Sequence, residues 1–452
     1  MKENIRFIHA ADIHLGSILH IGDELPGHLQ EVAKKASLNA FKNICDTAIK
    51  SRVDFVLLAG DVYDQEARSV MANRYFNKQC QRLSEENIPV YMIGGNHDPL
   101  GNNNIPLDIP ENVHLFNDDK PEIKEVTDKN NNVRARIIGQ SYQKKAESTN
   151  ISKAYKIDDK HYWNIAMLHT QLDPNNKKYV PCSLTDLIQI DNIDYWALGH
   201  VHKFNIVYNN NNKVVSYPGI TQGRDIGEQG LKGAVLVELS NLNDPIINFV
   251  PTADVIWKKL EYNVVENISN LTDLKEKIIE NIESFIKNKH TDINNAHIAE
   301  DQYWSDTFKG YVLRIILSGR TEINKVLKEQ GEEALQYLKE QICNQFQCQE
   351  PFLWVDKIID RTGKPLPNIE ELSQKNNVFS DIIKMVDKCK EDISIKKELL
   401  DEFGTIWSES IEESNRDYLK FELSQERLDI ILNQAQQLIF EELLSGGETN
   451  DH

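Results

Sequence analysis

Ligand-type side chains follow short apolar segments at five places in the first half of this 452-residue chain. Each segment is typical of a short buried strand, and a carboxylate, an imidazole or an amide follows it within a few residues. A single polar residue of this kind is common in loops. Five such positions in succession predict one polar site that is built from several strand ends. The five sites are Asp12-Ile-His14, Gly60-Asp61-Val-Tyr-Asp64, Asn96-His97-Asp98, His169 and Gly199-His200-Val-His202.

These residue types suit the hydrolysis of a phosphate ester by two metal ions. Two divalent cations about 3.5–4 Å apart can activate a water molecule and hold the oxygens of a phosphate. A carboxylate such as Asp61 can bridge both cations because it has two oxygens, whereas imidazoles and the Asn96 amide add neutral ligands. This mixture of nitrogen and oxygen favours Mn²⁺, Fe or Zn²⁺ over Mg²⁺, which prefers an all-oxygen shell.

The elements that carry the first three sites alternate between strand and helix. We expect strands at Ile5 to His9, Asp54 to Leu58 and Val90 to Ile93, with helices at Leu29 to Ile49 and Met71 to Leu83 between them. This order predicts a parallel sheet, whose ligands lie beyond the carboxyl ends of the strands.

The last two sites follow two further strands. Asn164 to Leu168 ends at His169, and Asp194 to Leu198 ends at Gly199-His200. Ala234 to Leu239 reads as a closing strand, and a shift in composition near Pro245 to Asp254 suggests a domain boundary. We therefore expect a first domain over residues 1–252.

A small α/β unit is expected over residues 253–362. Its pattern predicts strands and helices in alternation, and Thr362 to Pro367 reads as a linker to the next region. The expected elements are strands at Lys258 to Val265, Tyr311 to Leu317 and Phe352 to Ile359, and helices at Leu271 to Phe285 and Ile323 to Phe346.

The remaining region, residues 363–452, is acidic and helical. From Leu366 onward it has 20 acidic and 9 basic residues, so it carries more than half of the net charge of −19. Two apolar stripes at helical spacing allow either a hairpin that packs on its own chain or an adaptor for a partner coiled coil, and both stay open. The stripes are Leu399, Leu400, Phe403, Ile406 and Trp407, and Leu428, Ile431, Leu432, Ala435, Leu438 and Ile439.

Composition limits the class of protein. A 40% hydrophobic and 27% charged share is that of a globular protein. The net charge of −19 argues against a globally basic nucleic-acid binder, although bound cations can invert the charge of an acidic cleft. Because the sequence has no long apolar run and starts directly with a strand-like segment, we expect a cytoplasmic protein without a membrane span.

The ordered motifs resemble those of the calcineurin-like metallophosphoesterases, and in particular their DNA-repair exonuclease branch, the SbcD- and YhaO-like nucleases. Two more strings, Tyr179-Val-Pro-Cys-Ser-Leu184 and Tyr217-Pro-Gly-Ile-Thr-Gln-Gly-Arg224, are similar to the YhaO-like members. The resemblance covers about residues 5–240. Its motif strings are Ala11-Asp-Ile-His-Leu-Gly16, Ala59-Gly-Asp-Val-Tyr-Asp64, Gly95-Asn-His-Asp98 and Ala197-Leu-Gly-His-Val-His202.

The resemblance implies a fold and a set of ligands. The fold is a sandwich of two mostly parallel or mixed sheets flanked by helices, followed by a small α/β capping domain and a helical tail. The two metal ions would be held by Asp12, His14, Asp61 and His202 on one side and by Asp61, Asn96, His169 and His200 on the other.

The resemblance also implies roles beside the metals. His97 would face the substrate and protonate the leaving oxygen, with Asp64 orienting its imidazole. Asp98 is interpreted as a residue that fixes the turn. Arg224 and His20 are weaker candidates for contact with substrate.

The implied activity is a Mn²⁺-dependent DNA exonuclease that acts in DNA repair, with single-strand endonuclease action as an addition. Its implied partners are DNA, an SbcC-type coiled-coil ATPase bound through the C-terminal helices, and a second copy of the chain. One alternative is a phosphodiesterase or phosphatase that acts on nucleotides or other small phosphoesters. Another, from a different class, is a non-catalytic scaffold subunit of an ATPase complex.

Overall fold

The computed structural model describes residues 2–22, 25–64, 70–101, 109–210, 213–264, 268–287, 307–365, 377–392, 394–396, 398–399 and 425–446. The chain divides into two compact units. The first unit comprises Met1–Val264, Ile268–Ser318 and Val326–Arg361, and the second comprises Val265–Asn267, Gly319–Lys325 and Thr362–His452.

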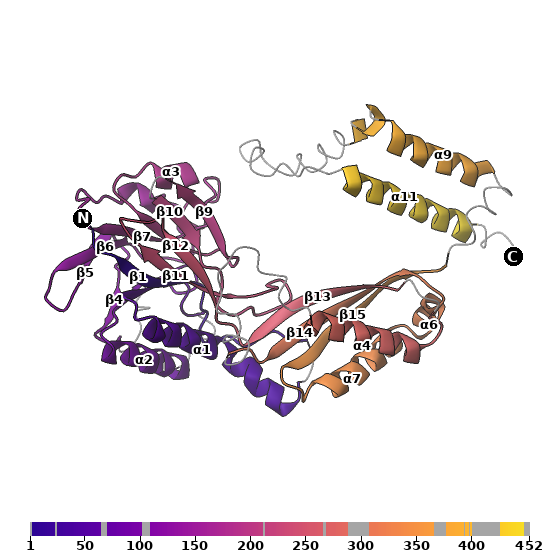
Figure 1. Ribbon diagram of the computed structural model, residues 1–452, viewed down its shortest axis with the longest axis horizontal. Coiled ribbons are helices and arrows are strands. Elements are labelled where there is room, and N and C mark those ends of the chain that lie inside the picture. Colours follow the sequence, from indigo (N-terminus) through magenta and orange to yellow (C-terminus); the bar gives the residue numbers. More distant parts are fainter. Residues whose placement is uncertain are drawn as a thin grey trace. The chain divides into compact units, whose positions relative to one another are not determined.

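Two six-stranded sheets form the centre of the first unit (Figure 1). The first sheet has the order β12-β11-β1-β2-β3-β4, and the second has the order β5-β6-β7-β8-β10-β9. Strands of the first sheet are β1 (Ile5–Ala10), β2 (Phe55–Ala59), β3 (Val90–Ile93), β4 (Val113–Leu115), β11 (Gly233–Leu239) and β12 (Ile246–Pro251). Strands of the second are β5 (Glu122–Thr127), β6 (Val133–Gly139), β7 (Trp163–His169), β8 (Tyr195–Gly199), β9 (Asn205–Asn210) and β10 (Lys213–Tyr217).

Both sheets are mixed, with a parallel centre. Strands β1 to β4 are parallel to one another, as are β6, β7, β8 and β10, whereas β11, β12, β5 and β9 each run antiparallel to the strands beside them. The parallel strands bring the ends of β1, β2 and β3 to one edge of the first sheet, and those of β7 and β8 to one edge of the second. The expected sandwich of mixed sheets is confirmed.

Alternation along the strands divides the core into layers. In β2, Phe55 and Leu57 point between the two sheets, while Val56 and Leu58 point to the opposite face. Helices α1 (Gly27–Lys50) and α2 (Val70–Glu85) cover that opposite face with residues such as Phe41 and Phe76, and they lie side by side in Figure 1. The outer face of the second sheet packs against α3 (Leu184–Ile188) and the short helix η1 (Ile151–Ala154).

The sequence did not reveal every strand. Strand β12 lies inside the stretch from Pro245 to Asp254 whose composition suggested a domain boundary, and its residues do not alternate between apolar and polar. Strands β5 and β9, which pair with β6 and β10, were missed as well, because half of the residues in β5 are charged and half of those in β9 are asparagines.

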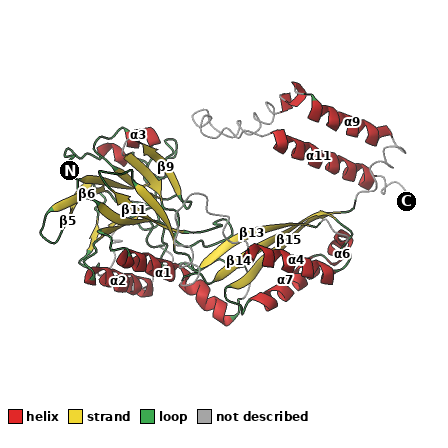
Figure 2. Ribbon diagram, viewed as in Figure 1, coloured by secondary structure: helices red, strands yellow, loops and turns green. Residues whose placement is uncertain are grey.

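A three-stranded sheet of order β13-β14-β15 follows the sandwich. Helices α4 and α7 pack on it through apolar stripes that include Leu274, Ile278, Leu338 and Ile342, and the helices and strands of this part are distinguished in Figure 2. Its elements are β13 (Val255–Asn263), α4 (Leu271–Lys287), β14 (Gly310–Arg320), α6 (Ile323–Gln330), α7 (Glu332–Phe346) and β15 (Phe352–Gly363).

Two helices, α9 (Asn377–Glu391) and α11 (Gln425–Gly446), form a hairpin in the second unit. Phe379 at the start of α9 contacts Phe440 near the end of α11, with ring centroids 5.1 Å apart, and Lys390 Nζ donates to Asn433 Oδ1 at 2.7 Å. Of the stripe predicted on α11, Leu428 is buried, whereas Leu438 and Ile439 are exposed. Leu400, Phe403, Ile406 and Trp407 of the other stripe lie outside the described residues.

Among the described helices, none combines the length and the apolarity that crossing a bilayer requires.

Candidate metal centre

The loops that follow β1 and β2 are joined by their backbones. The amide of Asp12 donates to Gly60 O at 3.1 Å, and the amide of His14 donates to Asp61 O at 3.1 Å. Asp12, His14 and Asp61 all have positive φ angles, of 50°, 45° and 50°, and His200 has a φ of 95°. Residues other than glycine rarely adopt positive φ angles. Four site residues therefore have a strained backbone, of the kind that clusters at functional sites.

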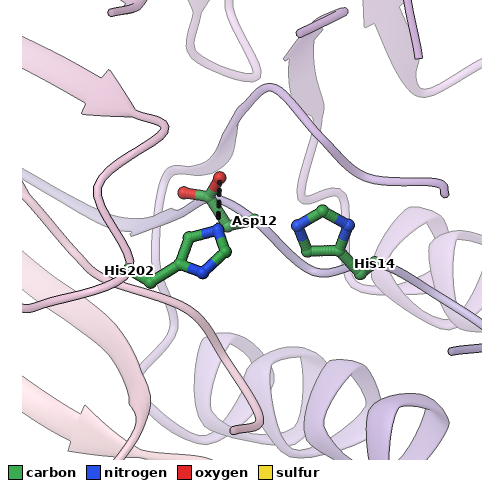
Figure 3. Close-up of side chains that lie close together, drawn as sticks. All are labelled: Asp12, His14 and His202. Carbon is green, nitrogen blue, oxygen red and sulfur yellow. Dashed lines mark ion pairs between the residues drawn. The ribbon is translucent and has the colours of Figure 1, made fainter. Parts of the chain in front are cut away.

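Asp12, His14 and His202 form the first group, which we call the Asp12 cluster. Their ligand atoms lie within 4.8 Å of one another, and His202 Nε2 is 3.7 Å from Asp12 Oδ1 (Figure 3). The Asp12 carboxylate also accepts the backbone N–H of His200 at 3.0 Å. Among the described residues, neither ring nitrogen of buried His14 has a hydrogen-bond partner. A buried imidazole without a partner is costly unless a cation completes it, so this cluster fits a metal ion.

Asp61, His169 and His200 form the second group, which we call the Asp61 cluster. His169 Nε2 is 3.2 Å from Asp61 Oδ2. Asn96 Oδ1 lies 3.0 Å from His169 Nε2 and 3.1 Å from His200 Nδ1, so the amide oxygen faces the same space. On its other side, His169 Nδ1 donates to Ala59 O at 2.9 Å, which orients the ring. These nitrogen and oxygen donors also fit a divalent cation.

The buried charges of the Asp61 cluster interact strongly. Burial opposes ionisation of both partners, but the nearby imidazolium lowers the pKa of Asp61, and Asp61 in turn raises the pKa of His169 to about 9. His169 is therefore protonated on both ring nitrogens at neutral pH, and a metal ion must displace the proton on Nε2. Burial lowers the pKa of His200 to about 3, so this imidazole is already neutral.

In the Asp12 cluster the two imidazoles differ. Burial, with help from the Arg224 charge, lowers the pKa of His14 well below its usual value. Burial also acts on His202, but the hydrogen bond to Glu228 and the negative charges of Asp12 and Glu228 together outweigh it and raise the pKa of His202. His14 is therefore a neutral ligand before any cation arrives.

Two glycines allow the loops to approach the Asp61 cluster. A Cβ at Gly95 would overlap the Asp61 carboxylate and crowd the His169 ring, and one at Gly199 would overlap Ala59 O and crowd His169 Nδ1. A side chain at either position would therefore occupy the space in which the cluster's donors meet.

Asp98 holds the loops after β2 and β3 together. Its carboxylate accepts four backbone N–H bonds, from Gly95 at 2.6 Å, Asp61 at 3.1 Å, Val62 at 2.8 Å and Tyr63 at 3.1 Å. This geometry supports its interpretation as a turn residue.

His97 and Asp64 lie beside the two clusters. His97 Nδ1 is 3.4 Å from Asp64 Oδ1, and the other oxygen of Asp64 is 3.9 Å from His14 Nδ1. The backbone N–H of His97 donates to Asp61 Oδ1 at 2.8 Å. The His97 side chain is 42% exposed, whereas those of His14 and His169 are almost fully buried, so His97 faces the solvent from which a substrate arrives.

The structure places Arg224 next to this pair. Its guanidinium lies 3.9 Å from Asp64 Oδ2, and its side chain is 18% exposed. His20 is joined to Arg224 only through the backbone, because its N–H donates to Arg224 O at 2.8 Å while its side chain is exposed.

Sequence reasoning missed Glu228. Its carboxylate lies 2.6 Å from His202 Nδ1 and 3.3 Å from the Arg224 guanidinium. Burial opposes its ionisation, but the hydrogen bond from His202 lowers the pKa of Glu228 to about 2. Glu228 lies in a loop and does not follow an apolar strand, so the pattern that identified the other site residues could not identify it.

The chain is similar to several known proteins, among them a bacterial protein and two archaeal ones. The chain is 32% identical to the uncharacterized metallophosphoesterase YhaO of Bacillus subtilis, over 86% of this chain and 88% of that protein. It is 26% identical to the DNA double-strand break repair protein Mre11 of Methanococcus maripaludis, over 72% of this chain and 86% of that one. The Mre11 protein of Methanocaldococcus jannaschii is 28% identical, over 68% and 80%.

The calcineurin-like phosphoesterase family matches residues 5–204, the stretch that carries all five motifs. The two clusters supply nitrogen and oxygen donors for divalent metal ions, as this family of hydrolases implies. The predicted resemblance is confirmed, and the chain belongs to the calcineurin-like metallophosphoesterase family.

Proposed function

We propose that this chain is a metal-dependent DNA exonuclease, which hydrolyses phosphodiester bonds in DNA repair and also cuts single strands internally. The observation that carries the proposal is that the two clusters lie beside an exposed His97 that is paired with Asp64. The similarity to two proteins named for DNA double-strand break repair supports the choice of DNA as substrate.

We assign one divalent ion to Asp12, His14, Asp61 and His202, and the other to Asp61, Asn96, His169 and His200. Ions bound there would supply an activated water and positive charge for the phosphate oxygens. The mixed donor set favours Mn²⁺, with Fe or Zn²⁺ as alternatives and Mg²⁺ less suited. The chain's own contribution is to hold these donors in place before substrate binds.

His97 is assigned to the leaving oxygen. Its exposed ring can give a proton to the departing sugar oxygen, and Asp64, 3.4 Å away, orients the ring. Arg224 beside Asp64 supplies a positive charge that can approach a phosphate, and His20 on the adjoining loop is a weaker candidate for the same contact.

An assay on end-labelled DNA tests this function directly. The metal-reconstituted chain should shorten single- or double-stranded DNA from one end, and the order of labelled products gives the polarity. No cleavage of either substrate with Mn²⁺, Fe²⁺ or Zn²⁺ would contradict the proposal.

The acidic charge supports a second candidate. A net charge of −19 repels the phosphate backbone of DNA, so a small phosphoester such as a nucleotide is the alternative substrate. Turnover with Mn²⁺ on a labelled duplex, on a cyclic nucleotide and on bis-p-nitrophenyl phosphate separates the two. Faster turnover of the cyclic nucleotide than of DNA would favour the alternative.

We further propose that residues 253–362 act as a cap that restricts which DNA ends reach the metal ions, and that residues 363–452 bind a coiled-coil ATPase of the SbcC type. In support of the second role, α9 and α11 leave large apolar side chains exposed, including Val378, Met385, Ile430 and Leu438. A chain truncated after Arg361 should fail to co-purify with that ATPase, and retained binding would contradict the assignment. A second copy of the chain is a further proposed partner, which the oligomeric state in solution tests.

A further inference from the structure

The side chain of Glu228 joins two parts of the site. It is 12% exposed, and it lies in the loop that leads from Arg224 to β11. Oε1 is 2.6 Å from His202 Nδ1 and accepts from the Arg224 guanidinium at 3.3 Å, and Oε2 accepts the backbone N–H of Arg224 at 2.7 Å. Both carboxylate oxygens are therefore engaged.

The contact with His202 decides which ring nitrogen faces the Asp12 cluster. A carboxylate oxygen can only accept, so Nδ1 carries a proton and donates it to Glu228. Nε2, which lies 3.7 Å from Asp12 Oδ1, is then the nitrogen whose lone pair can bind a cation. A carboxylate partner of this kind orients a ligand imidazole and increases its basicity.

The contact with Arg224 reaches the other side of the site. The guanidinium of Arg224 lies between Glu228, at 3.3 Å, and Asp64, at 3.9 Å. Asp64 is in turn 3.4 Å from His97 Nδ1. One carboxylate thus anchors a residue of the Asp12 cluster and the arginine next to the His97 pair.

The loop itself has hydrogen bonds that do not involve the Glu228 carboxylate. The backbone N–H of Glu228 donates to Asp225 O at 3.0 Å, and the N–H of Gly227 donates to Asp225 Oδ1 at 2.7 Å. The side-chain amide of Gln222 donates to Val255 O at 2.8 Å. A change at the Glu228 side chain can therefore leave most of the loop in place.

We propose that Glu228 is a positioning residue, which fixes the tautomer and orientation of His202 for metal binding and holds Arg224 beside Asp64. This role rests on the proposed metal assignment, since its consequence is the affinity of the Asp12 cluster for a divalent cation. It does not depend on whether the substrate is DNA.

Two substitutions of equal length separate the hydrogen bond from the charge. Glu228→Gln keeps an oxygen that accepts from His202 Nδ1, whereas Glu228→Met fills the same space without an acceptor. Titration of the metal-free full chain with Mn²⁺ alone, followed by calorimetry, should show that Glu228→Met weakens one of two bound ions by about 10–100-fold. The same titration should show a smaller loss for Glu228→Gln.

Glu238→Met is the matched control, because Glu238 lies on β11 and pairs with Arg6 at 3.0 Å, away from both clusters. If Glu228→Met binds both Mn²⁺ ions as tightly as Glu238→Met, the proposal is overturned. If wild-type chain binds two Mn²⁺ ions but does not cleave DNA, the proposed function fails while the role of Glu228 stands.

The unaltered chain provides a second readout in case Glu228→Met does not fold. In a ¹⁵N-histidine-labelled, Zn²⁺-loaded sample, His202 Nδ1 should carry a hydrogen-bonded proton with a downfield resonance, assigned by its loss in His202→Asn. Protonation of Nε2 in place of Nδ1 would overturn the proposal.

Discussion

The Asp61 cluster and the Asp12 cluster hold the same kinds of ligand by different means. In the Asp61 cluster, His169 is oriented by a backbone carbonyl and paired with Asp61 at 3.2 Å, so its donors satisfy one another without a cation. In the Asp12 cluster, His202 depends on the side chain of Glu228. Its other imidazole, His14, has no hydrogen-bond partner among the described residues.

The two clusters therefore differ in how much stability the metal-free chain loses by holding the ligands in place. A buried imidazole without a partner destabilises the metal-free chain, whereas a buried ion pair is costly mainly when one member is removed. We therefore expect the Asp61 cluster to be part of the stable fold, and the Asp12 cluster to become stable only when a cation binds.

The largest effect should come from His97, which belongs to neither cluster. Replacement of His97 by Asn removes the proton donor while the ligands stay in place, so turnover should fall by about 10²–10⁴-fold with both metal ions retained. Cleavage of end-labelled DNA, whose departing sugar oxygen needs a proton, and metal content by mass spectrometry check this. Unchanged turnover would refute the assignment of His97, and no turnover in the wild-type chain would favour the scaffold alternative.

The two histidines should differ sharply in the metal-free chain. His169→Asn leaves the buried Asp61 carboxylate without its cationic partner, and should cost about 3–5 kcal/mol of unfolding free energy. His14→Asn removes an imidazole that has no partner among the described residues, and should cost no more than about 1 kcal/mol. Urea denaturation in the presence of a chelator measures both, and equal costs would break the distinction between the clusters.

Asp98 holds the backbone of Asp61 and of Gly95 in place. Asp98→Asn places amide hydrogens against backbone donors, and the weakened bonds to Asp61 and Gly95 should lower stability by about 1.5–3 kcal/mol. Asp128→Asn is a suitable control, because Asp128 also accepts backbone bonds but lies in an exposed turn. Thermal melting compares the two variants, and a loss as small as that of the control would count against the role of Asp98.

Strands β1 and β8, which lead to ligands of the two clusters, should lose stability in acid. His9 in β1 is bonded to Tyr195 Oη at 3.0 Å and to Leu198 O at 3.2 Å in β8, and burial lowers its pKa from 6.5 to about 3. Below pH 6.5 the unfolded chain therefore binds a proton at His9, whereas the folded chain does not bind it until the pH falls to about 3. Stability should fall as the pH falls through this window, by about 1.4 kcal/mol per unit.

His9→Gln keeps a polar group without titrating in this range. Its loss of stability between pH 6.5 and 5 should be smaller than that of the wild type by about 2 kcal/mol. Urea denaturation at the two pH values checks this. An equal acid sensitivity of the two proteins would show that His9 is not the responsible group.

The sequence predicted the residues that the structure brings together because each of them ends a buried strand. Asp12, Asp61 and His169 are far apart in the chain, but parallel strands bring such ends to one edge. The first parallel sheet could be predicted for the same reason, since β1, β2 and β3 are apolar and the helices between them have clear periodicity. The sandwich of two sheets was implied by the resemblance to the metallophosphoesterases.

What the sequence did not reveal lacks such a pattern. Glu228 lies in a loop, and one more acidic residue in a chain with 70 of them carries no signal without the geometry of His202. Half of the residues in the edge strands β5 and β9 are charged or asparagine, and those of β12 do not alternate between apolar and polar. Their pairing with a neighbouring strand therefore could not be inferred from their composition. The difference between the clusters depends on the partners of the His14 and His169 side chains, which cannot be inferred from the spacing of residues in the sequence.

Anomalous scattering from Mn²⁺-loaded crystals tests the central claim most directly. We predict two peaks, one surrounded by Asp12, His14, Asp61 and His202 and the other by Asp61, Asn96, His169 and His200. A single peak, or a peak bound only by His14, Asp64 and His97, would contradict the two-cluster account.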